Sequence, residues 1–336
     1  MGKLKIFVCY HNDKFPIFKS EVFEPLFCGK YFYPENTGLI CDDTGDNISD
    51  KNRLYSELTG HYYVFRNYLN NAPEEYIGFC HYRRIFDITR IYETEQKMYV
   101  LKYENLKYLF DKSQKFDYYS KLKGFDCIIP PRDYFYEGGK TGTYKAQLPP
   151  ISCIEELNLC RKPDALDAMI TSIEDLTPEF IPAMTRVFQK TYAHLYNIYI
   201  FKKDCLKDYL EWEFKIFDEI EKRTNNFNNG EYKREAGYLA EKFINIWLEY
   251  KKEKNPEFKI GYAPIYTYDI VKESIERFKF FHSIERFDLE IEVMEYLTSI
   301  IPEQTSLYKV LAQAYENAGE LEKSRKALEK FSELSL

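Results

Sequence analysis

Short apolar runs alternate with stretches of helical periodicity over the first two thirds of the chain. The runs are rich in Ile, Val, Phe and Tyr and are bounded by polar, Gly or Pro residues, which is typical of buried strands. Because strands and helices alternate, the pattern predicts an α/β domain with a single, mainly parallel sheet flanked by helices. The strands are expected at residues 5–10, 38–41, 76–82, 125–129 and 195–201.

Helices are expected between these strands. The clearest helical pattern covers residues 50–70, where Leu54 and Leu58 lie one turn apart and Ser49 or Asp50 can cap the first turn. Further helices are expected within 151–192, where prolines interrupt the pattern, and over 204–223 and 236–252.

The end of the chain shows helical patterns alone, from about Ile270 onward. Its last unit matches much of the 34-residue tetratricopeptide pattern, and the unit before it matches loosely. Two such units cannot form a free-standing array, so we expect them to pack on the first domain. The sequence therefore predicts an α/β domain over residues 1–268 and a helical, tetratricopeptide-like tail over 269–336. The matching residues are Tyr308, Leu311, Ala312, Tyr315, Gly319 and Leu328.

Charge and composition narrow the functional classes. The net charge of −7 at pH 7 argues against a nucleic-acid partner, because phosphate neutralisation needs a surplus of Lys and Arg. No run approaches the roughly 20 apolar residues that cross a bilayer, and the start lacks the features of a signal peptide. We expect a cytoplasmic protein without a transmembrane segment, at most peripheral at the inner face of the membrane. The eight scattered cysteines form no C-x-x-C pair and are interpreted as structural.

The sharpest local feature is the segment GFCHYRRIFD, residues 78–87. If the strand continues through it, His81 and Arg83 face one side and Arg84 the other. A strand that ends in this way places positive charge at the carboxyl edge of a sheet, where ligands of open α/β sheets bind. Guanidinium groups bind phosphate oxygens, so the segment indicates a diphosphate site. The alternative, arginines paired with neighbours such as Asp87 and a structural histidine, is equally compatible with the residues.

A second polar cluster, TGDNISDKN at residues 44–52, opens the expected helix at 50–70. Backbone N–H groups at a helix start favour anions, and Asn or Ser side chains can hydrogen-bond to a base or a ribose. A well-capped helix explains the same residues and is the simpler interpretation of this segment alone. The sequence GGKTGT at 138–143 lacks the first glycine of a phosphate-binding loop and is interpreted as a flexible loop over the cleft.

Two later segments can complete a site. Asn197 places an amide beside the sheet, and residues 234–241 open a helix that carries Arg234, Glu235 and Glu241. A carboxylate beside a cleft can take a proton from a sugar hydroxyl, although most helix glutamates belong to ion pairs.

These blocks together resemble a family of domains of unknown function encoded in bacterial capsular and exopolysaccharide loci. Members are regarded as glycosyltransferases, some of them similar to galactofuranosyltransferases. The resemblance covers roughly residues 3–250 and rests on TGDNISDKNRLYSELTGHYYVFRN, YIGFCHYRRIF, FDCIIP, YNIYIFKKDCLKDYLEWEF and REAGYLAEKFINIWL.

The resemblance implies a GT-A-like, Rossmann-like fold and a hexosyltransferase that uses a nucleotide sugar. Such folds commonly hold a divalent metal (Mn or Mg) with an Asp-x-Asp pair after a central strand. Here that place is occupied by residues 81–84, so no metal ligand is assigned and metal dependence is doubted. Under the resemblance, Arg83 stabilises the leaving diphosphate, and His81 contacts a phosphate or the donor sugar, with its protonation tuning activity near the reference pKa of about 6.5.

The remaining site residues are assigned on the same basis. Glu241 is the first candidate for the general base if the reaction inverts, followed by Asp126 and Glu235. The donor-binding set is His81, Arg83, Arg84, Asp46, Asn47, Asn52, Asn197 and Arg234, of which Asp46, Asn47 and Asn52 are expected on the nucleoside side.

The implied substrates are a nucleotide sugar, most simply a UDP sugar of galactose or galactofuranose, and a lipid-linked or oligosaccharide acceptor of a growing capsular, exopolysaccharide or O-antigen glycan. The alternative function is a non-catalytic scaffold that binds nucleotide sugars or glycans. For the tail, stabilisation of the catalytic domain is preferred to docking of a neighbouring assembly enzyme.

Overall fold

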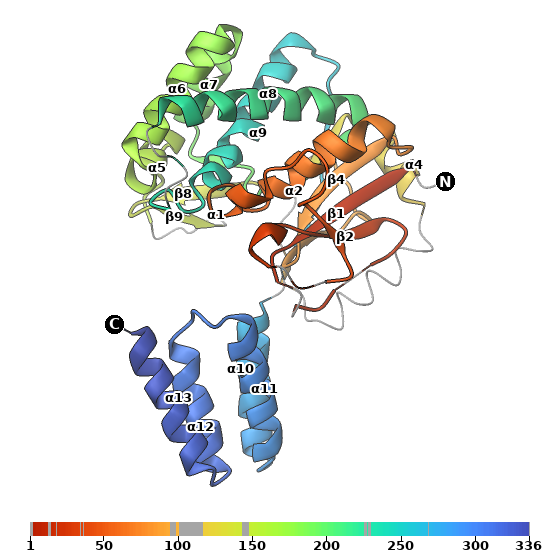
Figure 1. Cartoon of the computed structure of the whole chain (residues 1–336). Coiled ribbons are helices and arrows are strands. Elements are labelled where there is room, and N and C mark those ends of the chain that lie inside the picture. The colour runs from red at the N-terminus through yellow and green to blue at the C-terminus, as the bar shows by residue number, and fades with distance from the viewer. Residues whose placement is uncertain are drawn as a thin grey trace. The chain divides into compact units, whose positions relative to one another are not determined.

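The computed structural model describes residues 3–12, 15–17, 19–33, 35, 37–94, 99–100, 117–142, 148–224, 227, 230–267 and 269–335. The chain forms two compact units, of which the larger extends to Thr267 and the smaller consists mainly of residues 269–335 (Figure 1).

The larger unit is built on a mixed, mostly parallel sheet. Its main path has the strand order β12-β7-β11-β4-β1-β2-β3, and β5, β6 and β13 lie off this path. Neighbouring strands on the path pair in parallel, except that β11 runs antiparallel to both β4 and β7. The bounds are β1 (Leu4–Tyr10), β2 (Phe23–Phe27), β3 (Ile40–Cys41), β4 (Tyr76–His81), β5 (Arg84–Phe86), β6 (Tyr99–Val100), β7 (Cys127–Ile129), β11 (Tyr199–Lys202), β12 (Ile260–Tyr262) and β13 (Ile265–Thr267).

The register of the central strands brings polar residues to one edge of the sheet. Cys9 of β1 pairs with His81 of β4 on one side and with Leu26 of β2 on the other. Because these three strands are parallel, the residues that follow them emerge at the same carboxyl edge. The α/β fold with a mostly parallel sheet and flanking helices is therefore confirmed.

Helices cover the sheet and complete the core. The long helices α8 (Lys203–Arg223) and α9 (Glu235–Lys254) bury aromatic side chains between them, including Tyr209, Trp212 and Trp247. The shorter helices are α1 (Asn52–Tyr55), α2 (Leu58–Tyr63), α4 (Tyr118–Leu122), α5 (Cys153–Cys160), α6 (Pro163–Leu176) and α7 (Ile181–Gln189).

Short helical turns and a small sheet complete the larger unit. The turns are η1 (Lys30–Phe32), η2 (Ser49–Lys51), η3 (Val64–Tyr68), η4 (Leu69–Asn71) and η5 (Pro178–Phe180). A separate three-stranded antiparallel sheet contains β8 (Asp133–Tyr136), β9 (Lys140–Gly142) and β10 (Tyr192–Ala193). The predicted loop at 138–143 is the β8–β9 hairpin as far as Gly142, with Gly138 and Gly139 at positive φ, and Thr143 lies outside the described residues.

The expected single helix at 50–70 was wrong. It is interrupted between α1 and α2, because Ser56 adopts φ 53° and ψ −131°, which no helix contains. From Leu58 to Asn71 the chain stays helical, as α2, η3 and η4 in succession. The sequence pattern also missed β2, whose Pro25 lowered its strand signal although the strand lies inside the sheet.

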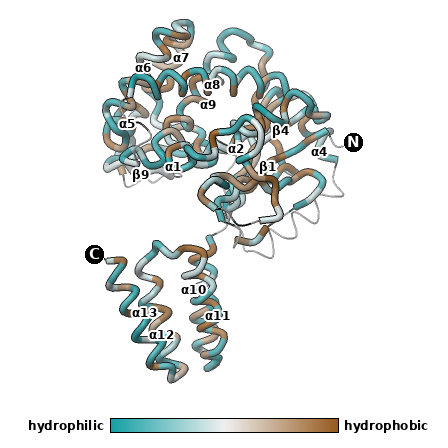
Figure 2. The backbone as a smooth tube through the Cα atoms, viewed as in Figure 1, coloured by the Kyte–Doolittle hydropathy of each residue, from teal (hydrophilic) through white to brown (hydrophobic). Residues whose placement is uncertain are grey.

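The smaller unit consists of four helices: α10 (Ile270–Ser283), α11 (Phe287–Ile300), α12 (Ser306–Asn317) and α13 (Leu321–Leu334). Met294, Leu297, Leu311 and Ala314 are buried between them. Polar and apolar residues are interleaved along these helices (Figure 2). The tetratricopeptide assignment and the packing of the tail remain predictions. Across the described residues of both units, none of the helices combines the length and the apolar character of a membrane span.

Candidate functional site

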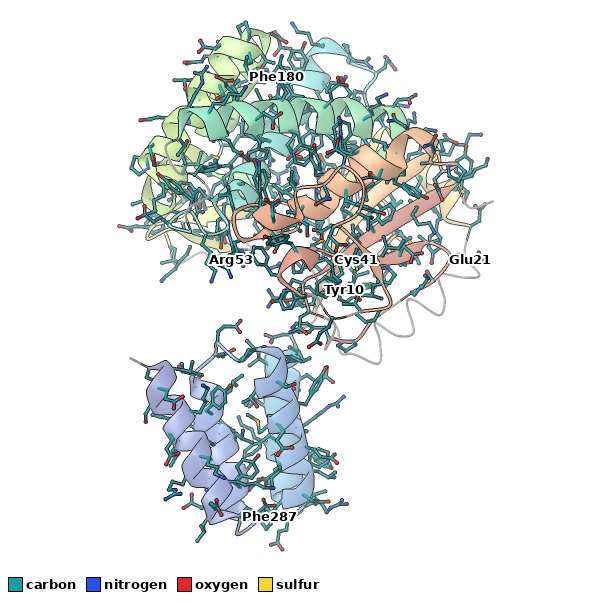
Figure 3. The ribbon with its side chains drawn as sticks, in the orientation of Figure 1. Tyr10, Glu21, Cys41, Arg53, Phe180 and Phe287 are labelled. Carbon is teal, nitrogen blue, oxygen red and sulfur yellow. The ribbon has the colours of Figure 1, made fainter. Side chains whose placement is uncertain are left out.

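A pocket of about 290 Å³ opens at the carboxyl edge of the sheet, where β1, β2 and β4 end. Tyr10 and His11 follow β1, Cys28 follows β2, and His81 ends β4. The turn after β4 adds Tyr82 and Arg83. Further walls come from α1 and the turn after it, and from the loop before α9. Tyr10 and Arg53, both labelled in Figure 3, belong to this pocket.

Four cationic side chains line the pocket: Arg53, Arg83, Lys233 and Arg234. No carboxylate forms an ion pair with any of them within the described part of the chain. The Nε atom of Arg83 is buried and has no hydrogen-bond partner there, and its guanidinium lies 5.1 Å from the ring centre of Tyr82. In a protein of net charge −7, four unpaired cations around one cavity create a local anion site.

The cationic surface extends beyond this pocket. Arg53 and Lys233 also line a neighbouring pocket of about 230 Å³, whose floor contains the buried side chains of Leu54 and Tyr232. The guanidinium of Arg53 lies 4.6 Å from the ring centre of Phe32, which is a wall of the second pocket. A ligand larger than one pocket can therefore contact the same two cations from both sides.

Both pocket histidines are held neutral near pH 7. Burial, followed by the positive charges of Arg83 and Arg234, lowers the pKa of His11 to about 4. Burial, then Arg84 and Arg83, lowers the pKa of His81 well below its usual value. The expectation that His81 titrates near 6.5 was therefore wrong, because it assumed solvent around the imidazole. Neutral imidazoles contribute hydrogen-bonding atoms here rather than charge.

Glu57 is the one carboxylate residue in the described lining of the main pocket. Its Oε1 accepts a 2.7 Å hydrogen bond from Nδ2 of Asn197. Glu57 was not among the predicted site residues, because the sequence pattern places it inside a continuous helix at residues 50–70. The helix break at Ser56 is what turns it toward the pocket, and no residue type in the pattern signals that break.

Asn52 and Ser56 form the wall beside Glu57. Nδ2 of Asn52 donates to the carbonyl oxygen of Ser56 at 2.6 Å and to Oγ1 of Thr59 at 3.0 Å. Asn52 lines the pocket as expected, but its amide donors hold the turn at Ser56. Backbone strain of this kind persists where surrounding contacts fix it, and it clusters at functional sites.

The structure brings His81, Arg83, Asn52 and Arg234 of the predicted donor-binding set to the pocket. Arg84 does not line it. Because β4 ends at His81 and a turn follows, the strand alternation stops there, and Arg84 begins β5. Its guanidinium instead lies 4.0 Å from the ring centre of Tyr196.

Asp46 and Asn47 also lie outside the described lining of the pocket, contrary to their expected place on the nucleoside side. Asp46 accepts hydrogen bonds from Tyr62 and from Arg66, the latter at 2.6 Å. Asn47 donates to the carbonyl of Gly45 and accepts from the backbone of Ser49. Both side chains stabilise the turn before η2. This agrees with the simpler interpretation of residues 44–52, a structural helix start rather than a nucleoside site.

The three candidate bases of the sequence analysis have other partners and do not line this pocket. Asp126 forms an ion pair with Lys202 at 2.8 Å and accepts from the backbone of Lys259. Glu235 forms an ion pair with Arg161 at 3.3 Å.

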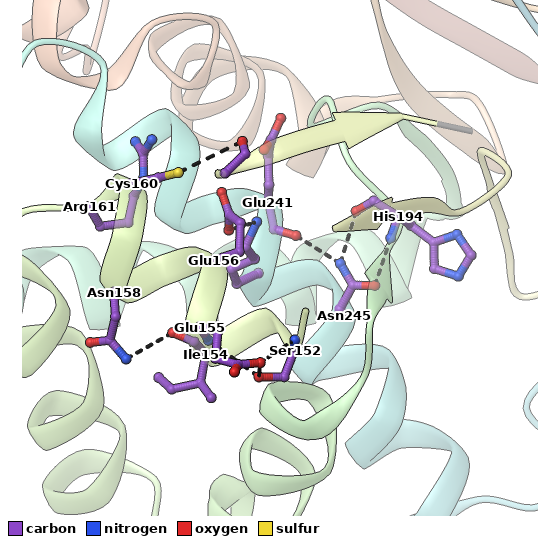
Figure 4. A network of polar contacts seen from close by, with 12 residues as sticks. Ser152, Ile154, Glu155, Glu156, Asn158, Cys160, Arg161, His194, Glu241 and Asn245 are labelled. Carbon is purple, nitrogen blue, oxygen red and sulfur yellow. Dashed lines mark hydrogen bonds and ion pairs between the residues drawn. The ribbon is translucent and has the colours of Figure 1, made fainter. Parts of the chain in front are cut away.

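Glu241 is held by hydrogen bonds to residues outside the described pocket lining. Its Oε1 accepts from the backbone N–H of Tyr196 at 2.9 Å. Its carbonyl oxygen accepts from Asn245, which also bonds to both backbone groups of His194 (Figure 4). Burial raises the pKa of Glu241.

Possible metal ligands are sparse. Over the stretches that the structure describes, no three His, Cys, Asp or Glu side chains gather closely enough to hold an ion. The described pocket lining contains one glutamate, two histidines and two cysteines, but the positive charge of its four cations disfavours a divalent metal.

Comparison with known proteins gives a family and a fold relative. Residues 5–253 match the model of the family described as domain of unknown function DUF4422. No curated protein matches the chain. Among solved structures, the chain is similar to the apo structure of the bifunctional glycosyltransferase WbbM, with a TM-score of 0.65 and 25% sequence identity. The similarity covers 80% of this chain and 46% of that one, so this chain spans less than half of the WbbM chain's length.

Proposed function

The chain belongs to the DUF4422 family, and we propose that it is a glycosyltransferase that transfers a hexose from a nucleotide sugar to a glycan acceptor. The glycosyltransferase-like fold supports this reaction class, and the similarity to WbbM points the same way. The donor is proposed to be UDP-galactose or UDP-galactofuranose, and the acceptor a lipid-linked or oligosaccharide precursor of a capsular polysaccharide, exopolysaccharide or O-antigen.

The observation that carries the proposal is the group of unpaired cations around one pocket at the carboxyl edge of the sheet. A diphosphate carries several negative charges and accepts hydrogen bonds through many oxygens, so it can occupy such a pocket without a counter-ion. Charge-assisted hydrogen bonds from guanidinium groups to phosphate are among the strongest in proteins. Lys233 adds a compact, less directional charge.

The same cations suit the chemistry of transfer. As the bond between the sugar and the diphosphate breaks, negative charge develops on the phosphate oxygen that leaves. Fixed positive groups aimed at this oxygen stabilise the transition state more than the ground state. Arg83 is proposed for this role because its Nε atom is buried and has no partner in the described chain.

In this proposal the cations replace the metal that related folds hold with an Asp-x-Asp pair. The corresponding residues, 81–84, contain a histidine and two arginines. These groups do not fit a divalent ion, so we route no step through one. Activity that is insensitive to chelation is expected.

A panel of nucleotide sugars tests the proposed function. The purified protein is incubated with UDP, GDP, CMP and dTDP sugars, and release of the nucleotide is measured with and without an oligosaccharide acceptor. Slow hydrolysis or transfer from one donor is expected. Binding of nucleotides without any turnover would instead indicate a scaffold. The absence of both binding and turnover would refute a nucleotide-sugar site altogether.

A further inference from the structure

We infer that Glu57 is the base that activates the acceptor and that Asn197 is the residue that positions its carboxylate. This inference rests on the proposed function and assigns residues to a step that the proposal leaves open. It also replaces the sequence-based candidates Glu241, Asp126 and Glu235.

Glu57 is suited to this step by its place. It lies in the pocket wall among the cations that are proposed to hold the diphosphate, so an acceptor hydroxyl near the donor sugar can reach it. Asn197 donates to its Oε1, and no side chain or backbone group of the described residues forms a hydrogen bond with its Oε2. A carboxylate with one oxygen held and the other available has the arrangement required of a general base.

Asn197 is fixed more firmly than a surface amide. It is 3% exposed, and its Nδ2 donates both to Glu57 and, at 2.9 Å, to the carbonyl oxygen of Gly237 in α9. Both amide hydrogens therefore have acceptors, and the side chain cannot rotate without losing two hydrogen bonds. Rigid support of this kind is what a positioned catalytic group needs.

The backbone that carries Asn197 is strained. Tyr196 and Asn197 adopt φ values of 78° and 52°, in the left-handed region that non-glycine residues seldom adopt. Tyr196 is anchored at both ends, because its N–H donates to Glu241 and its hydroxyl to Asp133. Two consecutive strained residues lower the stability of the folded state. Such backbone strain persists where surrounding contacts fix it, and it is common at functional sites.

The proposed step is a single displacement with inversion. The acceptor oxygen forms a bond to the anomeric carbon while the bond from that carbon to the phosphate oxygen breaks. The bonding electron pair goes to the leaving diphosphate, next to the cations. The hydroxyl proton passes to Glu57, which later releases it to solvent. No further reactant is needed, and the products are the glycoside and a nucleoside diphosphate.

The first test compares two isosteric variants, Glu57→Gln and Glu241→Gln. Both glutamates accept one hydrogen bond through Oε1, which glutamine can also accept, but only Glu57 lines the pocket. Hydrolysis of UDP-galactose provides a readout with water as the acceptor, and UDP binding is measured by calorimetry. Glu57→Gln should lower kcat about 100-fold or more while changing the Kd for UDP by less than about threefold, which is within 0.7 kcal/mol. Glu241→Gln should keep kcat within about threefold of wild type, an equally small change in free energy.

The second test separates the amide of Asn197 from its backbone. Asn197→Gly keeps the left-handed conformation without strain and removes only the side chain. A roughly tenfold loss of kcat is expected, with the Kd for UDP unchanged. Loss of the two hydrogen bonds of this buried side chain should also lower the melting temperature. Addition of formate to Glu57→Ala should restore part of the hydrolysis, because an external carboxylate can occupy the vacated place.

The outcomes are distinguishable. The inference is overturned if Glu57→Gln retains kcat, if Glu241→Gln loses it instead, or if Asn197→Gly leaves kcat unchanged. A wild-type protein that neither binds UDP nor hydrolyses UDP-galactose would contradict the proposed function with these donors, whatever the variants do.

Discussion

Nδ2 of Asn197 lies 2.7 Å from Oε1 of Glu57, although the two residues are 140 positions apart in the sequence. The bond joins the turn before β11 to the break between α1 and α2. It brings the one glutamate of the described pocket lining into contact with a turn that has two consecutive non-glycine residues at positive φ. Neither partner has a local sequence signal for this contact, so only the fold reveals it.

Removal of Arg83 should weaken binding of a nucleoside diphosphate. The loss of a charge-assisted hydrogen bond costs about 1.5–3 kcal/mol, so Arg83→Ala should raise the Kd for UDP roughly 10- to 150-fold in calorimetry. Arg66→Ala is the matched control, because Arg66 is an exposed arginine paired with Asp46 away from the pocket. Equal Kd values for the two variants would show that Arg83 does not contact the ligand.

The electrostatic field of the pocket can be measured at His11. Burial and the charges of Arg83 and Arg234 lower its pKa to about 4. Its imidazole should therefore stay neutral down to about pH 5 in an NMR titration, and Arg83→Ala should move the midpoint upward. A midpoint near 6.5 in the wild-type protein would mean that the pocket is solvated and weakly charged.

The stability of the larger unit should fall as the pH rises from 4.5 to 8. Burial raises the pKa of Glu213 from its ordinary value of 4.5 to about 8, so in this window the folded protein retains a proton that the unfolded chain releases. By linkage, this residue lowers the free energy of unfolding by up to about 1.4 kcal/mol per pH unit. Glu213→Gln should reduce the difference in melting temperature between pH 5 and pH 8. An unchanged difference would contradict a buried, neutral Glu213.

Close packing of the central strands predicts opposite effects at two glycines. A Cβ atom on Gly78 of β4 would lie 2.6 Å from the carbonyl oxygen of Tyr199 on β11, and backbone cannot yield cheaply. Gly78→Ala should lower the free energy of unfolding by roughly 1–3 kcal/mol in denaturant titrations.

Gly237 serves as the matched control, since a Cβ atom there would meet Ser56 at an ordinary 3.5 Å. Gly237→Ala lies in a helix and should be neutral or stabilising by about 0.5–1 kcal/mol. A tolerated Gly78→Ala would mean that β4 and β11 are spaced more widely than the structure has them.

Periodicity and composition were enough to predict five of the seven strands on the main path of the sheet, the long helices α8 and α9, and the α/β class. The cationic edge after β4 could also be predicted, because a buried run followed by His81 and Arg83 marks the end of a strand at a sheet edge. The prediction for Arg84 failed because strand alternation does not continue past His81. A turn follows β4, and Arg84 belongs to the next strand, β5.

The carboxylate of the site could not be predicted in the same way. In the sequence, nothing distinguishes Glu57 from Glu241 or Asp126. Only the three-dimensional contacts show that Glu241 and Asp126 have structural partners, whereas Glu57 lines a cavity. At Ser56 the positive φ is accompanied by a local hydrogen bond from Asn52, whereas at Asn197 it is accompanied by a tertiary hydrogen bond to Gly237. Such backbone conformations cannot be predicted from local sequence propensity alone.

The central claim is that the four cations of the main pocket hold the diphosphate of a nucleotide sugar. A crystal structure of the protein soaked with UDP tests it most directly. The account predicts phosphate oxygens within hydrogen-bonding distance of the Arg83 guanidinium, with at least one further contact from Arg53, Lys233 or Arg234. A diphosphate bound elsewhere, or bound through a metal ion and carboxylates with Arg83 turned away, would contradict it.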